Sequence, residues 1–191
     1  MIKYIGLGHI CIIVDSVEQA TEFYQRALGA IPIQEFPHFK NIGFAKAAGF
    51  LQEPEKVDVS ISFLLLPGTK ICLELMEYHS PLGNRKVEFF KAYDVSGVRH
   101  VCLKVANIDE AFNHLKSISG ITMINQSEEY QPFRIDQITP NDFKFFDLDL
   151  ENSLEEKEKV CQVVGNTRYF YFLDPYGIQW ELEQGHDDIG E

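Results

Sequence analysis

Two histidines and two glutamates stand at matching places in the two halves of this 191-residue chain, and their side chains are of the kind that hold a metal ion. The first pair is His9 and Glu74, and the second is His100 and Glu181. Two imidazoles with two carboxylates suit a borderline divalent cation, and octahedral geometry would leave two positions for water or substrate oxygens. The residue types therefore predict one divalent ion, Ni, Co, Zn, Mn or Fe, without selecting among these metals.

Each histidine lies near the start of a segment that occurs twice in outline. The stretch "GHICIIVDSVEQATEFYQRALG" (8–29) matches "RHVCLKVANIDEAFNHLKSISG" (99–120). In both copies a Cys, a Val, an Ala and a Gly follow the histidine at the same distances along the chain. The glutamates lie in a second pair of matching blocks, "KICLELMEY" (70–78) and "GIQWELEQG" (177–185). Two blocks in the same order, each with a metal-capable residue, indicate an internal repeat.

A strand followed by a helix is predicted at the start of each copy. β-branched residues are dense directly after each histidine, which favours a strand. Ser16 and Asn107 are each followed three residues later by Gln or Glu, a spacing typical of a helix N-terminus. Gly29 and Gly120 suit the left-handed position that ends a helix.

The candidate ligands are expected to share one kind of sheet face. Side chains alternate along a strand, so residues two apart point the same way. His9 then shares a face with Cys11, and His100 with Cys102, opposite aliphatic residues that can pack under the helices. The glutamate strands alternate in the same manner. Two curved half-sheets joined edge to edge would place the polar faces in a common cleft.

Each half is predicted to fold in the order β-α-β-β-β. The fold class is α+β, with paired βαβββ modules forming a curved mixed sheet around a metal-binding cup. Residues 1–84 would form the first module, 85–98 a linker with a short helix, and 99–191 the second module, with an insertion at about 126–166. Phenylalanines of the insertion could cap an apolar substrate or pack on the sheet edge.

Composition excludes some classes of partner. The net charge is −12 and no basic stripe is present, so nucleic acid is not expected. No apolar run approaches the ~18 residues of a membrane span and no signal-peptide pattern opens the chain, so a cytoplasmic location without membrane contact is expected. The four cysteines have no CxxC spacing, and buried, reduced thiols are expected. No role is assigned to the histidines outside the repeat register: His38, His79, His114 and His186.

The repeat and its four candidate ligands resemble the vicinal oxygen chelate superfamily. This superfamily includes glyoxalase I, methylmalonyl-CoA epimerase, extradiol dioxygenases, and the fosfomycin and bleomycin resistance proteins. The resemblance covers nearly the whole chain apart from the insertion. It implies paired βαβββ modules that cup a divalent metal, with ligands at His9, Glu74, His100 and Glu181 by position.

Two members of the superfamily are similar in parts. "ELMEYHSPLGNRKVEFFKAYDVSGVRHVCLKV" looks like methylmalonyl-CoA epimerase, in which a Ser-Pro segment and a short helix join the modules. "FLDPYGIQWELEQ" looks like the Asp-Pro-x-Gly ending of glyoxalases and dioxygenases. An oxygenase site has two histidines and one carboxylate, so a second carboxylate at Glu74 would fill a position that O2 and substrate need.

The resemblance implies a metal-dependent isomerase or lyase of the epimerase or lactoylglutathione lyase type. Such an enzyme moves a proton alpha to a carbonyl through a metal-bound enediolate. Glu181 is the expected base and Glu74 its counterpart on the opposite face. The substrate would be a small molecule with an alpha-oxygenated carbonyl, and a homodimer is compatible with folds that often pair modules between chains. The alternatives are a non-catalytic binding or resistance protein of the bleomycin-resistance type, or an extradiol-type dioxygenase.

Overall fold

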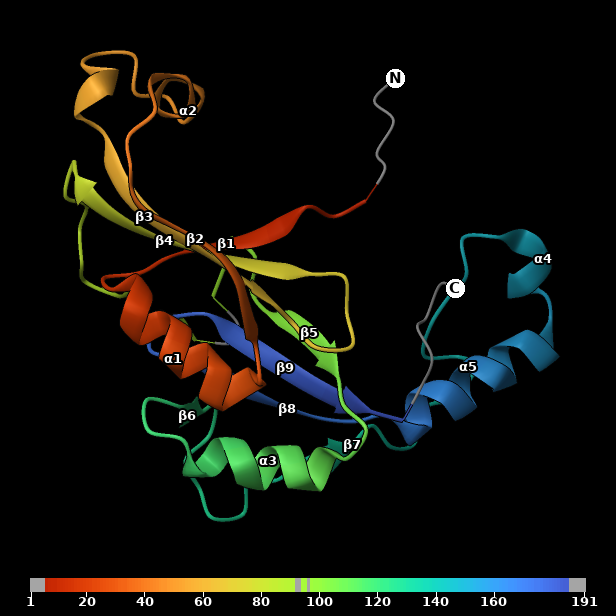
Figure 1. The fold of residues 1–191 in the computed structure, drawn as a ribbon. Helices are drawn as coiled ribbons and strands as arrows, with labels where there is room; N and C mark the ends of the chain where they lie inside the picture. Colours follow the sequence, from red (N-terminus) through yellow and green to blue (C-terminus); the bar gives the residue numbers. More distant parts are fainter. Residues whose placement is uncertain (1–5, 92–93, 96, 186–191) are drawn as a thin grey trace. The chain divides into compact units, whose positions relative to one another are not determined.

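A computed structural model describes residues 6–91, 94–95 and 97–185 of the chain (Figure 1). The chain divides between Glu88 and Phe89 into two compact units, named here the first and the second module. Each module is built around one curved, mixed β-sheet. His186 lies outside the described residues.

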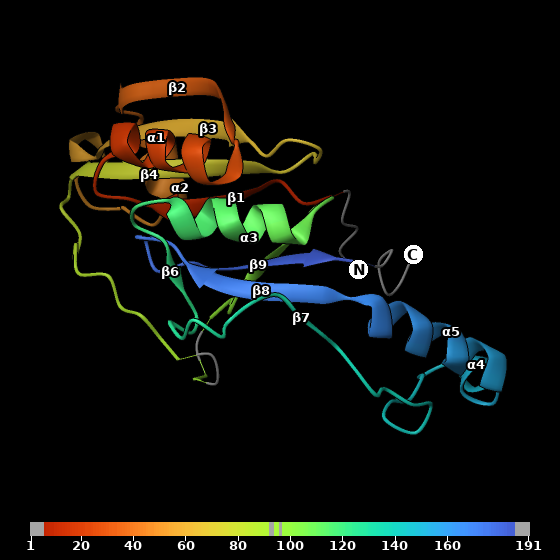
Figure 2. The same ribbon diagram turned by 90° about the horizontal axis from the view of Figure 1, so that it is seen from below.

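The first module is a four-stranded sheet with a helix packed on one face (Figure 2). The strand order is β1-β4-β3-β2, in which β1 runs parallel to β4 and the other neighbours are antiparallel. Its elements are β1 (His9–Ile13), α1 (Val17–Leu28), β2 (Ile31–Phe39), α2 (Ile42–Ala47), the 3-10 turn η1 (Pro54–Lys56), β3 (Asp58–Leu65) and β4 (Cys72–Ser80).

The second module repeats this topology with the strand order β5-β9-β8-β6 and one additional strand, β7, paired with β8. Strand β5 runs parallel to β9, as β1 does to β4. The α+β fold of paired βαβββ modules is therefore confirmed. Its elements are β5 (Val101–Lys104), α3 (Ile108–Ser117), β6 (Thr122–Met123), β7 (Phe133–Arg134), α4 (Leu148–Glu151), α5 (Leu154–Asn166), β8 (Arg168–Leu173) and β9 (Gln179–Gln184).

The connection between β4 and β5 is described only in part, because residues 92, 93 and 96 lie outside the described residues. A short helix is predicted within 85–98, but the described residues 85–91, 94–95 and 97–98 form none. The Ser-Pro segment is thus followed by irregular chain over these residues.

Helices α1 and α3 begin where the capping pattern predicts. The side chains of Ser16 and Asn107 each accept the backbone N–H three residues on, at 3.3 and 3.2 Å. Gly29 ends α1 in the left-handed conformation, with φ 65°. The expectation for Gly120 is wrong, because α3 already ends at Ser117 and Gly120 lies in the turn beyond it. No helix in the described part of the chain is long and apolar enough to cross a membrane.

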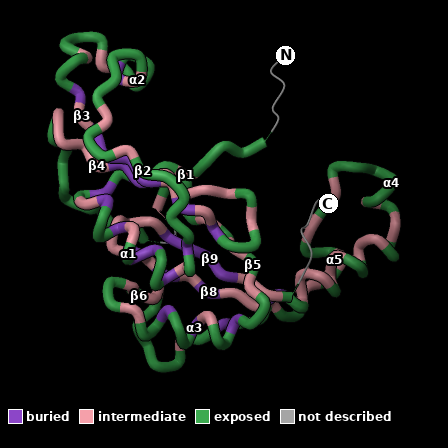
Figure 3. The backbone as a smooth tube through the Cα atoms, in the orientation of Figure 1, coloured by how far each residue is buried: buried purple, intermediate pink, exposed green. Residues whose placement is uncertain are grey.

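Buried residues are concentrated in the strands of both sheets (Figure 3). On the helix side of the first sheet, the cross-strand neighbours Ile12 and Leu75 are 3% and 0% exposed. Trp180 and Leu182 of β9 are 0% and 4% exposed in the second module. Burial of each such side chain stabilises the fold by about 1.5–3 kcal/mol. The apolar halves of the alternating strands therefore form the core under the helices, as predicted. The opposite face of the first sheet has a second buried cluster, Val59, Ile61 and Met76, beside the position of Glu74.

The turn between β8 and β9 is organised by Asp174, which is 1% exposed. Its carboxylate accepts the backbone N–H groups of Tyr176 and Ile178 and the indole N–H of Trp180, each at 2.9 Å. The Asp-Pro-Tyr-Gly stretch is thus a structural turn. It determines where β9, the strand of Glu181, begins.

The predicted insertion at 126–166 carries α4 and α5, which extend beyond the first residue of β8 (Figure 1). Lys157 holds the insertion together. Its ammonium donates to the carbonyl oxygens of Pro140 and Phe143 and pairs with Glu151 at 2.8 Å. No residue of α5 is buried. The part of the insertion around α4 and α5 is therefore stabilised by its own contacts, whereas the part before it is tied to the sheet by the pairing of β7 with β8.

Candidate metal centre

His9 and Glu74 lie side by side on the open face of the first sheet. Strands β1 and β4 are parallel neighbours, with Cys11 opposite Glu74 in the register. His9 Nε2 is 3.1 Å from Glu74 Oε2. The imidazole is 47% exposed and the carboxylate 14%, so the pair is reached from the imidazole side.

His100 and Glu181 form the equivalent pair in the second module. His100 directly precedes β5, and Glu181 lies opposite Cys102 in the register of β5 and β9. His100 Nε2 is 3.0 Å from Glu181 Oε2, with side-chain exposures of 38% and 12%. The two pairs thus occupy the same place in the repeat.

Both pairs have the spacing that a metal ion requires of adjacent ligands. Two atoms in neighbouring octahedral positions, each about 2.1 Å from the ion, are about 3.0 Å apart. The observed distances of 3.1 and 3.0 Å match this value. The same distance is also that of a hydrogen bond between an imidazole and a carboxylate, so the spacing is compatible with a cation but not specific for one. The structure brings His9 to Glu74 and His100 to Glu181, and a single ion for both pairs stays a prediction.

An aromatic ring from the neighbouring strand packs beside each histidine. Phe63 on β3 lies opposite Glu74 in the register, 6.1 Å from the imidazole between ring centroids. Tyr171 on β8 lies opposite Glu181, with a centroid distance of 5.3 Å. Burial, and then the charge of Glu181 and a hydrogen bond to it, raise the pKa of Tyr171 well above its usual value. The neutral hydroxyl of Tyr171 therefore orients Glu181, whereas Phe63 has no hydroxyl to orient Glu74.

The expectation of buried thiols is wrong. All four cysteines are free, but none is buried: Cys11, Cys72, Cys102 and Cys161. Cys11 is exposed as a residue, but the protein around its sulfur removes part of the hydration of the thiol. This desolvation is the largest influence on the pKa of the thiol. That desolvation, followed by the charge of Glu74 and a hydrogen bond to it, raises the pKa of Cys11 to about 12. Cys11 is thus a neutral thiol beside Glu74, and its Sγ lies 3.4 Å from Met76 Sδ.

Tyr171 and Glu183 lie beside the His100–Glu181 pair, but no role is predicted from the sequence for either residue. Glu183 follows Glu181 by two residues and shares its face, and Tyr171 is the cross-strand neighbour of Glu181. The alternation of side chains along β9 was enough to place Glu183 on the same face as Glu181. The position of Tyr171 depends on the register of β8 against β9, which the sequence pattern does not supply.

A separate polar cluster lies in the first module. His38 Nδ1 is 3.2 Å from Asp58, and the His38 ring stacks on that of His79 at 4.4 Å between centroids. His79 Nε2 is in turn 2.8 Å from Ser60 Oγ. Stacked imidazoles direct their nitrogens side by side rather than toward one ion. The cluster therefore does not resemble the His–Glu pairs.

Each module also has a cavity between its helix and an outer strand. The cavity between α1 and β2 has a volume of about 460 Å³, and the cavity between α3 and β6 about 220 Å³. Neither cavity is lined by a residue of the His–Glu pairs. The candidate metal ligands therefore lie on the open sheet faces and not in these cavities.

Comparison with known families identifies the class of protein. The model of the Glyoxalase/Bleomycin resistance protein/Dioxygenase superfamily matches residues 6–131, which is more than half of the chain. The chain therefore belongs to this superfamily, in agreement with its repeat and its topology.

The chain is also similar to curated members of the superfamily. It is 32% identical over 112 residues to mitochondrial methylmalonyl-CoA epimerase of Bos taurus, a match that covers 58% of this chain and 52% of that protein. The Homo sapiens epimerase is 31% identical over 112 residues, with the same coverage. The chain thus spans about half the length of the curated relatives it matches.

Solved structures show the same fold at low sequence identity. A glyoxalase family protein from Bacillus cereus has a TM-score of 0.62 at 15% identity, with 97% of each chain covered. A glyoxylase/bleomycin resistance protein/dioxygenase domain from Frankia sp. has a TM-score of 0.55 at 12% identity, covering 99% of this chain and 96% of its own. The fosfomycin resistance protein FosX of Listeria monocytogenes has a TM-score of 0.52 at 17% identity, with 96% and 95% covered.

Proposed function

We propose that this protein is a metal-dependent isomerase or lyase that moves a proton next to a carbonyl group. The observation that carries the proposal is a His–Glu pair at the same place in both modules, with N···O distances of 3.1 and 3.0 Å. One pair offers an ion only two ligands, fewer than protein sites for these metals supply. We therefore propose that His9, Glu74, His100 and Glu181 serve one divalent ion, within one chain or across two copies.

A bound divalent ion would polarise two substrate oxygens and so favour loss of the alpha-proton. The chain's own side chains would do the rest. Glu181 accepts the proton through a carboxylate oxygen, and the hydroxyl of Tyr171 keeps that carboxylate oriented. Glu74 is the counterpart that returns a proton to the other face of the carbon in an epimerase. The neutral Cys11 thiol beside it contributes a hydrogen bond.

The substrate class follows from the donor set and from the relatives. Four protein ligands would leave two octahedral positions of the ion free. These positions suit a compound with two oxygen atoms, either on adjacent carbons or on both sides of a carbon that can lose a proton to form an enolate. Methylmalonyl-CoA, named by the curated relatives, is the first compound to test. The hemithioacetal of methylglyoxal and glutathione is the second.

The proposal is tested by hydrogen exchange at the alpha-carbon. The full chain, loaded with Mn²⁺, is incubated with each compound in D2O and the alpha-proton is followed by NMR. We expect exchange in the wild type, a loss of about 100-fold or more in Glu181→Gln, and no loss in Glu155→Gln, which alters an exposed glutamate of α5. Exchange that survives Glu181→Gln would contradict the role of Glu181. Stoichiometric metal binding without any exchange would favour the binding or resistance protein, and O2 consumption with a catechol would favour the dioxygenase.

A further inference from the structure

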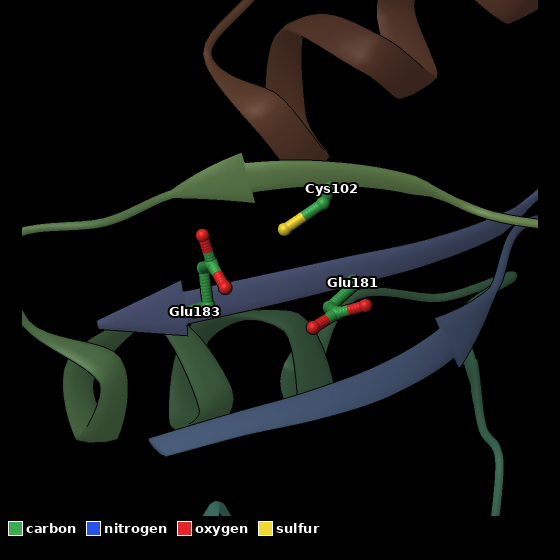
Figure 4. A group of neighbouring side chains, drawn as sticks. All are labelled: Cys102, Glu181 and Glu183. Atoms are coloured by element: carbon green, nitrogen blue, oxygen red, sulfur yellow. The ribbon is translucent and has the colours of Figure 1, made fainter. Parts of the chain in front are cut away.

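Three side chains of the second sheet lie close together (Figure 4). Cys102 offers its sulfur, and Glu181 and Glu183 each offer a carboxylate oxygen, and these atoms all lie within 4.8 Å of one another. Glu181 is only 9% exposed, Glu183 is partly buried and Cys102 is exposed. A thiol and two carboxylates in such a group are ligands for a cation that accepts both sulfur and oxygen.

The strand register explains why these groups meet. Cys102 lies directly opposite Glu181 across the parallel strands β5 and β9, and Glu183 is two residues farther along β9 on the same face. Both carboxylates therefore lie near one thiol, although like charges repel. Lys104 lies opposite Glu183 in the register and supplies positive charge at this edge of the group. Tyr169 lies opposite Glu183 on the other side.

The first module provides an internal comparison. Cys11 corresponds to Cys102 and lies opposite Glu74, just as Cys102 lies opposite Glu181. The position equivalent to Glu183 is Met76, whose sulfur is 3.4 Å from the Cys11 thiol. The first module thus has a thiol, a thioether and one carboxylate, whereas the second has a thiol and two carboxylates. Among the described residues, a thiol with two carboxylates in one group occurs in the second module alone.

We propose that Cys102, Glu181 and Glu183 form a second cation position, which takes a thiophilic divalent ion such as Zn²⁺ and shares Glu181 with His100. In a tetrahedral zinc site the sulfur and oxygen ligands are about 3.4–3.6 Å apart. The observed separations, at most 4.8 Å, need to close by at most about 1.4 Å, within the rotamer freedom of two partly open side chains. The metal–sulfur bond replaces the S–H bond and the thiol proton passes to solvent, while water takes the fourth position.

Cadmium is the probe, because a cadmium–thiolate bond gives an ultraviolet charge-transfer band that is independent of any enzyme activity. The full chain is titrated with Cd²⁺ as wild type, Cys102→Ser and the matched control Cys11→Ser. We expect one equivalent to produce the band in the wild type and in Cys11→Ser, and no band in Cys102→Ser. A band that persists in Cys102→Ser, or that disappears in Cys11→Ser, overturns the proposal.

Two further variants separate ligand loss from structural damage. Glu183→Gln should weaken Cd²⁺ binding by at least about 10-fold. Lys104→Met should strengthen it by about 3- to 10-fold, because it removes a cation that competes for Glu183. Damage to the sheet would weaken binding in both variants, so weaker binding in Lys104→Met counts against the proposal.

This position is distinguishable from the proposed catalytic ion. Glu74→Gln alters the first module only, so it should diminish Mn²⁺ retention but leave the Cd²⁺ band intact. Failure of the wild type to retain Mn²⁺, together with a Cys102-dependent Cd²⁺ band, would refute the proposed function alone. Mn²⁺ retention without such a band would refute the second cation position alone.

Discussion

Replacing Asp174 by alanine should destabilise the second module more than any comparable change on its surface. The carboxylate is 1% exposed and accepts three N–H groups, from Tyr176, Ile178 and Trp180, at 2.9 Å each. Hydrogen bonds to a charged group contribute about 1.5–3 kcal/mol each, and the alanine leaves all three donors without this acceptor. Because part of the turn can relax and hydrate, we expect a loss of about 3–5 kcal/mol, a large share of the stability of a domain.

Urea unfolding measures this loss. Trp180 is the only tryptophan of the chain, so its fluorescence reports on the second module, with circular dichroism as a check on the altered indole environment. Asp142→Ala is the matched control, since Asp142 also accepts two hydrogen bonds in a turn but is exposed. The stability of Asp174→Asn should lie between those of the wild type and Asp174→Ala. The asparagine oxygen can still accept hydrogen bonds, but its NH2 group, also a donor, would face the indole N–H. An Asp174→Ala variant no less stable than Asp142→Ala would refute the reasoning.

Three further changes have definite expected results. Gly185→Ala should lower the melting temperature, because a Cβ there would lie 2.2 Å from the backbone oxygen of Asn166 at a φ of +126°; unchanged calorimetry would contradict this. The Arg168 guanidinium holds the pKa of the Asp109 carboxyl below its usual value. The pair therefore stabilises the fold at a pH above the ordinary carboxyl pKa, and this stabilisation is lost as the pH falls through the lowered pKa of Asp109. The melting temperature should depend less on pH in the acid range in Arg168→Gln than in the wild type. Lys157→Met should accelerate chymotryptic cleavage within 126–166 without lowering the melting temperature of the sheet, and equal cleavage rates would show that Lys157 does not hold the insertion.

The repeated pattern was sufficient to predict the topology and the faces of the strands. Alternation places Ile12 and Leu75 in the core and His9 on the other face, and the structure has this arrangement. Ser16 and Asn107 cap their helices because capping depends on residues only three apart. These features are local, and so a single sequence contains them.

Features that depend on contacts between distant residues could not be predicted in this way. The neighbour of Glu181 on β8 is Tyr171, and only the register between the two strands reveals it. The meeting of His38 with His79 depends on the pairing of β2, β3 and β4 rather than on the repeat. Gly120 looks like a helix end, but α3 ends earlier and the glycine serves the following turn.

The metal content of the purified full chain tests the central claim most directly. Wild type, Glu74→Ala and His100→Ala are reconstituted with Mn²⁺, which prefers oxygen and imidazole ligands to thiolate, and are analysed for bound metal after removal of excess ion. The proposed ligand set predicts one ion per chain in the wild type and its loss in both variants, one from each module. Retention of Mn²⁺ in either variant, or a wild type that binds no ion after reconstitution with Ni, Co, Mn or Zn, would contradict it.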